Sequence, residues 1–213
     1  GVKMSKTKGN VLDPLELIQQ FGTDALRFAL TIGTAPGNDL RVGESKLESS
    51  RNFANKIWNA ARFVMSALEG AGTPSLDGWY ELQEIKAYDG ASMVGSGNTR
   101  LEDRWIVHRL NEAAVSVNGY LKEYEIGEAQ RTVYEFVWGE FCDWYIEMAK
   151  ARLRSGDVTC LKVLAHVLER TLRLLHPFMP FITEEIWQNL RYRLPNEGNL
   201  PESIMVAPYL ESD

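Results

Sequence analysis

The chain has 213 residues, 45% of them hydrophobic, so it can bury a substantial core in one large domain or two small ones. Acidic residues outnumber basic ones by 29 to 23, and the net charge of −6 argues against a general nucleic-acid coat protein. Neither the two separated cysteines nor the three isolated histidines have the spacing of a metal site, and no apolar run could span a membrane.

The first ten residues, GVKMSKTKGN, predict a basic loop. Lys3, Lys6 and Lys8 alternate with small residues, and the run ends in Gly9-Asn10, which is a turn signal. Lysine side chains and backbone N–H groups can gather around a polyphosphate, so a loop of this kind suits a phosphate clamp. Composition alone leaves a frayed basic terminus as the alternative.

Two short helices are expected next. Asp13 has the residue type of an N-cap and is followed by Pro14 at the first helical position. Gly22 ends this helix, and Thr23 is expected to cap a second helix that runs to about Ile32. The following stretch, 33–41, is predicted to be a loop because it is rich in glycine, proline and asparagine.

The stretch Arg51–Phe63, RNFANKIWNAARF, predicts a helix with two different faces. Phe53, Ile57, Ala60 and Val64 recur at the spacing of a core-facing stripe. The opposite arc holds three amides, two cations and one aromatic ring: Asn52, Asn55, Asn59, Lys56, Arg62 and Phe63. Such groups hydrogen-bond bases, neutralise phosphates and stack on unpaired bases, so the pattern is compatible with an RNA-binding face. The pattern alone does not favour this over a solvated face with one exposed ring.

The rest of the chain predicts a glycine-rich connection followed by further helices. The helical period fails between Glu69 and Arg100 and returns in four segments, at about 101–124, 127–154, 157–175 and 180–193. In the second of these, Trp144 and Met148 fall among the apolar positions, so core packing is favoured over a cofactor site or a stacking role. Glu140 and Asp143 are expected to form ordinary salt bridges. After Pro195 the chain is expected to be extended, with Ile204–Val206 a short strand or packed along the helices.

Several motifs resemble those of one enzyme family. KMSKTKGN is similar to the KMSKS signature of class I aminoacyl-tRNA synthetases, with Thr7 keeping the hydroxyl of the usual last serine. The loop at 33–41 and the stretch Arg51–Phe63 resemble the valyl branch of subclass Ia. The resemblance covers nearly the whole chain, in the same order, through LEDRWIVHRL, FCDWYIEMAK and HPFMPFITEEIW, which lie at 101–110, 141–150 and 176–187.

The resemblance implies a mainly α fold. Residues 1–43 would hold the KMSKS-type loop and the stem-contact helices at the end of the catalytic part. Residues 44–213 would form an antiparallel α-helix bundle of the class Ia anticodon-binding type, with a loop-rich insertion at about 70–100. The nucleotide-binding domain with its HIGH-type motif, the editing domain and the C-terminal coiled coil would lie outside these residues.

The resemblance also implies a reaction. The parent enzyme would activate valine with ATP and esterify it to valine tRNA. Lys6 would contact the ATP phosphates and stabilise their developing charge from a mobile loop, Lys3 would pin the loop, and Ser5 and Thr7 would support it. Mg²⁺ would arrive with the ATP. We expect the isolated 213-residue segment to be inactive, with no metal and no bound cofactor of its own.

Valine tRNA is the partner that the resemblance implies. Phe63 would stack on an anticodon base, Lys56 and Arg62 would meet bases or phosphates, and Asn52, Asn55 and Asn59 would meet base edges. We expect a cytoplasmic monomer that contacts neither DNA nor a membrane. Two alternatives stay open: the same segment of an isoleucyl-tRNA synthetase, and a non-enzymatic helical interaction module derived from a synthetase.

Overall fold

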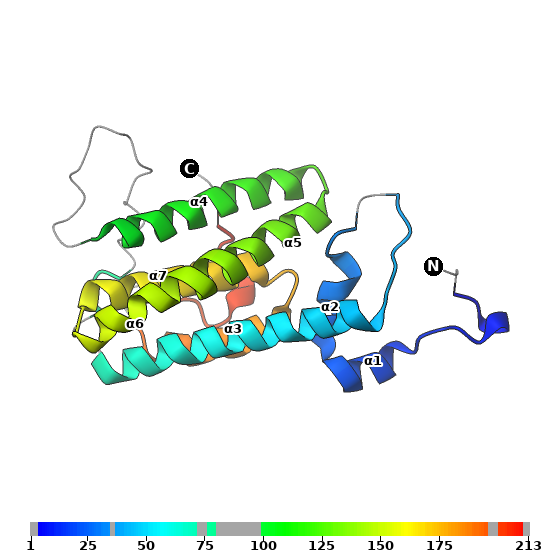
Figure 1. Cartoon of the computed structure of the whole chain (residues 1–213), viewed down its shortest axis with the longest axis horizontal. Coiled ribbons are helices and arrows are strands. Elements are labelled where there is room, and N and C mark those ends of the chain that lie inside the picture. Colours follow the sequence, from blue (N-terminus) through cyan, green and yellow to red (C-terminus); the bar gives the residue numbers. More distant parts are fainter. Residues whose placement is uncertain (1–3, 35–36, 72–75, 80–98, 196–199, 211–213) are drawn as a thin grey trace.

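The computed structural model describes residues 4–34, 37–71, 76–79, 99–195 and 200–210, and the regular structure in these ranges is helical (Figure 1). A bundle of long helices forms most of the molecule: α3 (Glu44–Ala71), α4 (Leu101–Lys122), α5 (Ile126–Glu135), the π-helical η4 (Phe136–Tyr145), α6 (Ile146–Arg154), α7 (Val158–Leu175) and α8 (Pro180–Arg191). The prediction of a mainly α bundle is therefore confirmed.

The amphipathic pattern of α3 produces the predicted core stripe. Phe53, Ile57, Ala60 and Val64 are all buried, because residues three, four and seven apart share one face of a helix. The helix is longer than the stretch that first revealed the pattern, and its buried face packs against α7 and α8.

The centre of the bundle is α7. Asp157 begins it as predicted, with its side-chain oxygen accepting a hydrogen bond from the backbone N–H of Cys160 at 3.1 Å. The helix ends at the His176-Pro177 step, where proline cannot continue the backbone ladder. It is apolar around most of its circumference and packs against α3, α4, α5, α6 and α8, as a central helix must.

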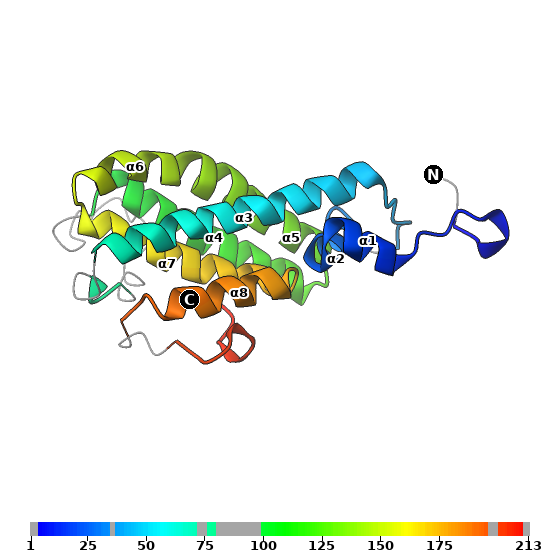
Figure 2. The same cartoon turned by 90° about the horizontal axis from the view of Figure 1, so that it is seen from below.

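Two short helices lie at one end of the bundle, away from α6 (Figures 1 and 2). The first, α1 (Pro14–Phe21), is capped by Asp13, which accepts from the N–H of Leu15 at 2.9 Å. Gly22 follows at φ +93°, a conformation that disfavours any residue with a Cβ. The second helix, α2 (Thr23–Thr31), starts at Thr23 itself, so the expectation that Thr23 is its cap is wrong.

The long helix from Ile126 to Arg154 has the predicted extent but contains a segment that the sequence did not reveal. In η4 the backbone hydrogen bonds span five residues, as from Ile146 N–H to Phe141 C=O, so each turn holds more residues than an α turn. This changes which side chains face inward. Trp144 is 65% exposed and Met148 is also exposed, so the prediction that these two lie in the core is wrong.

The last described residues run back along α8 (Figure 2). Trp187 Nε1 donates to the carbonyl of Pro201 at 3.1 Å, and a Glu184 oxygen accepts from the N–H of Ile204 at 3.1 Å. Residues Ile204–Val206 form a 3₁₀ turn, η6, and not a strand. Most of the predicted insertion at about 70–100 lies outside the described residues. Within the described ranges, no helix is both long and apolar enough to cross a membrane.

Candidate RNA-binding surface

The solvent-facing side of α3 carries a strip of polar side chains, which we call the α3 polar strip: Asn52, Asn55, Asn59 and Arg62. All four are exposed. Within the described part of the chain, none of these side chains makes a hydrogen bond or an ion pair. Amide and guanidinium groups that make no such contact can bind a ligand without first breaking a hydrogen bond or an ion pair within the protein.

Lys56 and Phe63, the other two residues predicted for this face, lie on its flank. Lys56 Nζ is 2.5 Å from an oxygen of Asp143 on η4 and 4.3 Å from the ring centroid of Trp138. Phe63 is half-buried and packs against the main core. The structure thus gives the six predicted residues two environments: four are free at the surface, and two are engaged by neighbouring side chains.

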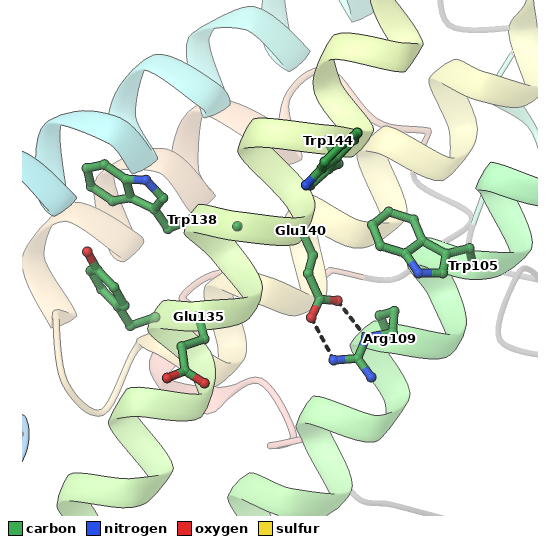
Figure 3. Close-up of a pocket in the computed structure, with 8 residues that line it drawn as sticks. Trp105, Arg109, Glu135, Trp138, Glu140 and Trp144 are labelled. Carbon is green, nitrogen blue, oxygen red and sulfur yellow. Dashed lines mark hydrogen bonds and ion pairs between the residues drawn. The ribbon is translucent and has the colours of Figure 1, made fainter.

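A groove lies between α4 and the α5–η4 helix (Figure 3). It has a volume of about 510 Å³ and we call it the tryptophan groove. Figure 3 shows the indoles of Trp105 and Trp144 beside a central ion pair, with Trp138 on the other side of Glu140. Its lining comes from three elements: Trp105, Arg109, Tyr134, Glu135, Trp138, Gly139, Glu140 and Trp144.

The floor of the tryptophan groove is a bidentate ion pair. Arg109 Nε and Nη2 donate to the two carboxylate oxygens of Glu140 at 2.7 and 2.6 Å, and Nη1 donates to Glu112 at 2.5 Å. The hydrogen bond to Glu140 is the main reason that the pKa of Arg109 is raised above its ordinary value. The prediction of ordinary salt bridges for Glu140 and Asp143 is confirmed, because Asp143 pairs with Lys56.

The groove and the α3 polar strip are neighbours on one surface. Trp138 lines the groove, and its ring also lies under the ammonium group of Lys56 on α3. Sequence analysis did not select Arg109 or the three tryptophans as binding residues. The available signal was the run FVWGEFCDWY at 136–145, whose aromatic density was interpreted as core because an α-helical period was assumed.

The second predicted site, the N-terminal loop, lies beyond α1, at the end of the molecule away from α6 (Figure 1). Ser5 N–H donates to the side chain of Asn10 at 2.8 Å, and the hydroxyls of Ser5 and Thr7 are 2.6 Å apart. A 3₁₀ turn, η1 (Lys6–Lys8), and Gly9 at φ +63° complete a closed turn. Lys3 and the side chain of Lys6 lie outside the described part of the structure.

No group of three or more histidine, cysteine, aspartate or glutamate side chains that could hold a metal ion occurs among the described residues. The two cysteines are buried, and burial raises the pKa of Cys142 to about 12 and that of Cys160 to about 11. Both thiols are therefore poor nucleophiles and poor metal ligands at neutral pH.

Two family models match this chain. Residues 103–213 match the anticodon-binding domain of tRNA ligase, and residues 1–43 match the class I tRNA synthetases for isoleucine, leucine, methionine and valine. Among curated proteins, the chain is 51% identical to the valine–tRNA ligase of Dehalococcoides mccartyi strain CBDB1 and 48% identical to that of Geobacillus stearothermophilus. These matches cover 100% and 98% of the chain, respectively, but only 22% of either relative.

Solved structures show the same fold at lower identity. A ternary complex of leucyl-tRNA synthetase from Agrobacterium radiobacter K84 with tRNA and LeuAMS matches with a TM-score of 0.66 and 21% identity, over 100% of this chain and 22% of that one. Methionyl-tRNA synthetase from Mycobacterium tuberculosis with methionyl-adenylate matches with a TM-score of 0.63 and 18% identity, over 86% and 34%. The chain therefore belongs to the family of tRNA-ligase anticodon-binding domains and is similar over its full length to one segment of valine–tRNA ligases.

Proposed function

We propose that this chain is the segment of a valine–tRNA ligase that reads the anticodon loop of valine tRNA. The observation that carries the proposal is a single surface with both kinds of group that unpaired bases need. The α3 polar strip offers free amides and a free guanidinium, and the adjoining tryptophan groove offers aromatic rings. The identity to valine–tRNA ligases over the whole chain supports valine over isoleucine as the amino acid.

The geometry supports a division of labour on this surface. Asn52, Asn55 and Asn59 can each donate and accept hydrogen bonds, which is what base edges require. Phe63 is half-buried, so its ring would be a fixed platform and not a mobile one. Lys56 would exchange its contact with Asp143 for a phosphate or a base, and Arg62 is free to do the same.

Residues 1–43 would contribute the phosphate-binding loop of the complete enzyme. A loop closed by Ser5 and Asn10 and rich in lysine fits the triphosphate of ATP, because it combines cations with backbone N–H groups. Lys6 would stabilise charge on the phosphates, Lys3 and Ser5 would hold the loop, and Mg²⁺ would come with the nucleotide. The complete enzyme would join valine to its tRNA in the cytoplasm as a monomer.

Binding of this chain to anticodon hairpins tests the proposal. The probes are an RNA hairpin with the anticodon stem and loop of valine tRNA, and hairpins in which single anticodon bases are replaced. We expect a preference for the valine hairpin that Asn55→Ala and Arg62→Gln weaken, each by about tenfold if one good base-edge contact is lost. Lys122→Ala removes an exposed cation at the end of α4 that is far from the groove, so it should leave hairpin affinity unchanged.

Phe63 needs a variant that separates stacking from packing. Phe63→Leu keeps most of the apolar volume against the core but removes the flat aromatic face, so the fold should survive while hairpin affinity falls. Equal and steeply salt-dependent binding to every hairpin would mean phosphate attraction alone and would overturn the proposal.

A further inference from the structure

The bundle holds α2 by its first turn and by its last. At the first turn, Asp24 reaches across to the start of α8 and accepts from the backbone N–H groups of Ile182 at 2.7 Å and Phe181 at 3.3 Å. The residue that precedes α8, Met179, provides no side-chain cap, so Asp24 does this from another helix. Arg27 adds a hydrogen bond to the carbonyl of Pro177 at 3.2 Å.

The end of α2 is held by the start of α5. Gln130 is fully buried; its Nε2 donates to the carbonyl of Phe28 at 2.9 Å, and its Oε1 accepts from the hydroxyl of Thr31 at 2.5 Å. Next to it, the two backbones meet at Gly127. A Cβ there would lie 2.5 Å from the carbonyl oxygen of Thr34 and 2.9 Å from its nitrogen, so only glycine permits this approach.

A chain of packed aromatic rings connects α2 to the RNA-binding surface. The centroid of Phe28 on α2 lies 5.0 Å from that of Phe53 on α3 and 6.4 Å from that of Tyr134 on α5. Tyr134 in turn lies 5.7 Å from Trp138, and both of these line the tryptophan groove. The segment that carries the KMSKT loop is thus fixed to the helix that carries the groove by packed rings and buried hydrogen bonds.

We propose that the α2 joint, formed by Asp24, Phe28, Gly127 and Gln130, sets the distance and orientation between the KMSKT loop and the anticodon surface. This rests on the proposed function: the complete enzyme would join valine to the tRNA whose anticodon this chain reads, so one tRNA would reach both the anticodon surface and the active site that the KMSKT loop serves. When a ligand has contacted one site, its effective concentration at the second depends on how well the connection fits the span. These four are positioning residues. Loosening the α2 joint leaves each site intact but weakens the binding of one tRNA at both sites at once.

The test uses two matched glycine substitutions in the full-length ligase that contains this chain. Gly127→Ala forces the start of α5 away from Thr34, whereas Gly119→Ala adds the same methyl to α4 with nothing within 4 Å. Four quantities are measured: the rate of pyrophosphate exchange with valine and ATP, the affinity for the isolated anticodon hairpin, and the KM and kcat of aminoacylation with whole tRNA. We expect Gly127→Ala to raise the KM for whole tRNA by about tenfold, which is part of the gain in affinity that two linked sites supply. The other three quantities stay within about twofold, and Gly119→Ala matches the wild type.

A second variant covers the case in which Gly127→Ala does not fold. Gln130→Met keeps the side-chain length and leaves the Gly127 contact alone, but removes both hydrogen bonds to α2, so it should raise the same KM. An unchanged KM in the folded variants would overturn the proposal. A parallel loss of hairpin affinity would also overturn it, since the damage would then lie in the RNA-binding surface itself. Failure of the wild-type chain to discriminate between hairpins would instead remove the proposed function.

Discussion

Trp144 provides the sharpest residue-scale test of the tryptophan groove. Its indole is 65% exposed, so truncation should change the free energy of unfolding by no more than about 0.5 kcal/mol. A base stacked on an aromatic ring is worth about 1–3 kcal/mol. We therefore expect Trp144→Ala to weaken binding of the valine anticodon hairpin by about fivefold or more, measured by fluorescence titration, while urea unfolding is unchanged.

Tyr192 is the matched control for Trp144. It is 80% exposed and stands at the end of α8, outside the groove, so Tyr192→Ala removes a comparable exposed ring. If Trp144→Ala binds the hairpin as well as Tyr192→Ala does, the groove takes no part in RNA binding, and the interface is reduced to the α3 polar strip.

At the scale of single residues, the sequence predicted the α3 polar strip but not the residues that contact Lys56 beside it. A helical wheel places Lys56 and Phe63 beside the asparagines correctly, since all six belong to one helix. It carries no information about other helices. That Asp143 and Trp138 engage Lys56 follows only from how η4 lies against α3, a tertiary contact between residues distant in sequence.

At the scale of elements, the π-helical segment shows where a sequence pattern stops being sufficient. Phe141 and Tyr145 are buried as the α-helical period predicts, but a wheel of 100° per residue also places Trp144 inside. The wider turns of η4 rotate later residues away from their predicted positions, so Trp144 faces the groove. A π turn therefore supplies the groove with a ring that an α turn would bury.

His166 on α7 links this central helix to the pH dependence of stability. Burial, aided by the nearby positive charges of Arg170 and Arg173, lowers the pKa of His166 to about 3 from its ordinary 6.5. Below about pH 6.5, His166 is protonated in the unfolded chain, whereas in the folded chain it stays neutral down to about pH 3. The free energy of unfolding is therefore not reduced by His166 above about pH 6.5. As the pH falls below this value, the free energy of unfolding decreases by about 1.4 kcal/mol per pH unit.

Urea unfolding at pH 6.5 and at pH 5 measures this effect, with His166→Gln as the comparison. Glutamine removes the titrating group and can still hydrogen-bond to the backbone of Trp79, which His166 contacts. We expect the wild type to lose about 2 kcal/mol more than the variant between the two pH values. Parallel losses in the two proteins would show that His166 does not couple folding to protons.

At the scale of the whole molecule, the N-terminal loop lies beyond α1 at one end of the structure, and the α3 polar strip runs along the middle of α3 (Figure 1). The sequence motifs predicted both sites and the helices between them, because helix signals are local. They could not predict how α2 is joined to the bundle. Asp24 meets α8 and Phe28 meets α5 across more than a hundred residues of chain, and a hydrogen bond of that kind leaves no periodic trace in the sequence.

The number of cations that meet RNA phosphates, and not the net charge of −6, sets the salt dependence of RNA binding by the whole chain. If Lys56 and Arg62 are the cations that meet RNA, the logarithm of the affinity should fall with the logarithm of salt concentration with a slope of about −1.4, two contacts at about 0.7 each. Asp143→Asn tests the part of Lys56, because it removes the carboxylate that holds the ammonium group. An exposed ion pair of this kind contributes at most about 1 kcal/mol to stability, so the variant should fold normally.

We expect Asp143→Asn to bind the valine anticodon hairpin several-fold more tightly at low salt, because Lys56 no longer has to leave a partner and one repulsive charge is gone. The control is Glu147→Gln, which removes a second surface carboxylate on the same long helix, one that pairs with Lys150 at 2.6 Å. Equal tightening by both variants would assign the gain to net charge alone. Tightening by Asp143→Asn only, lost when Lys56→Met is added, would assign it to the ammonium group that lies between the α3 polar strip and the tryptophan groove.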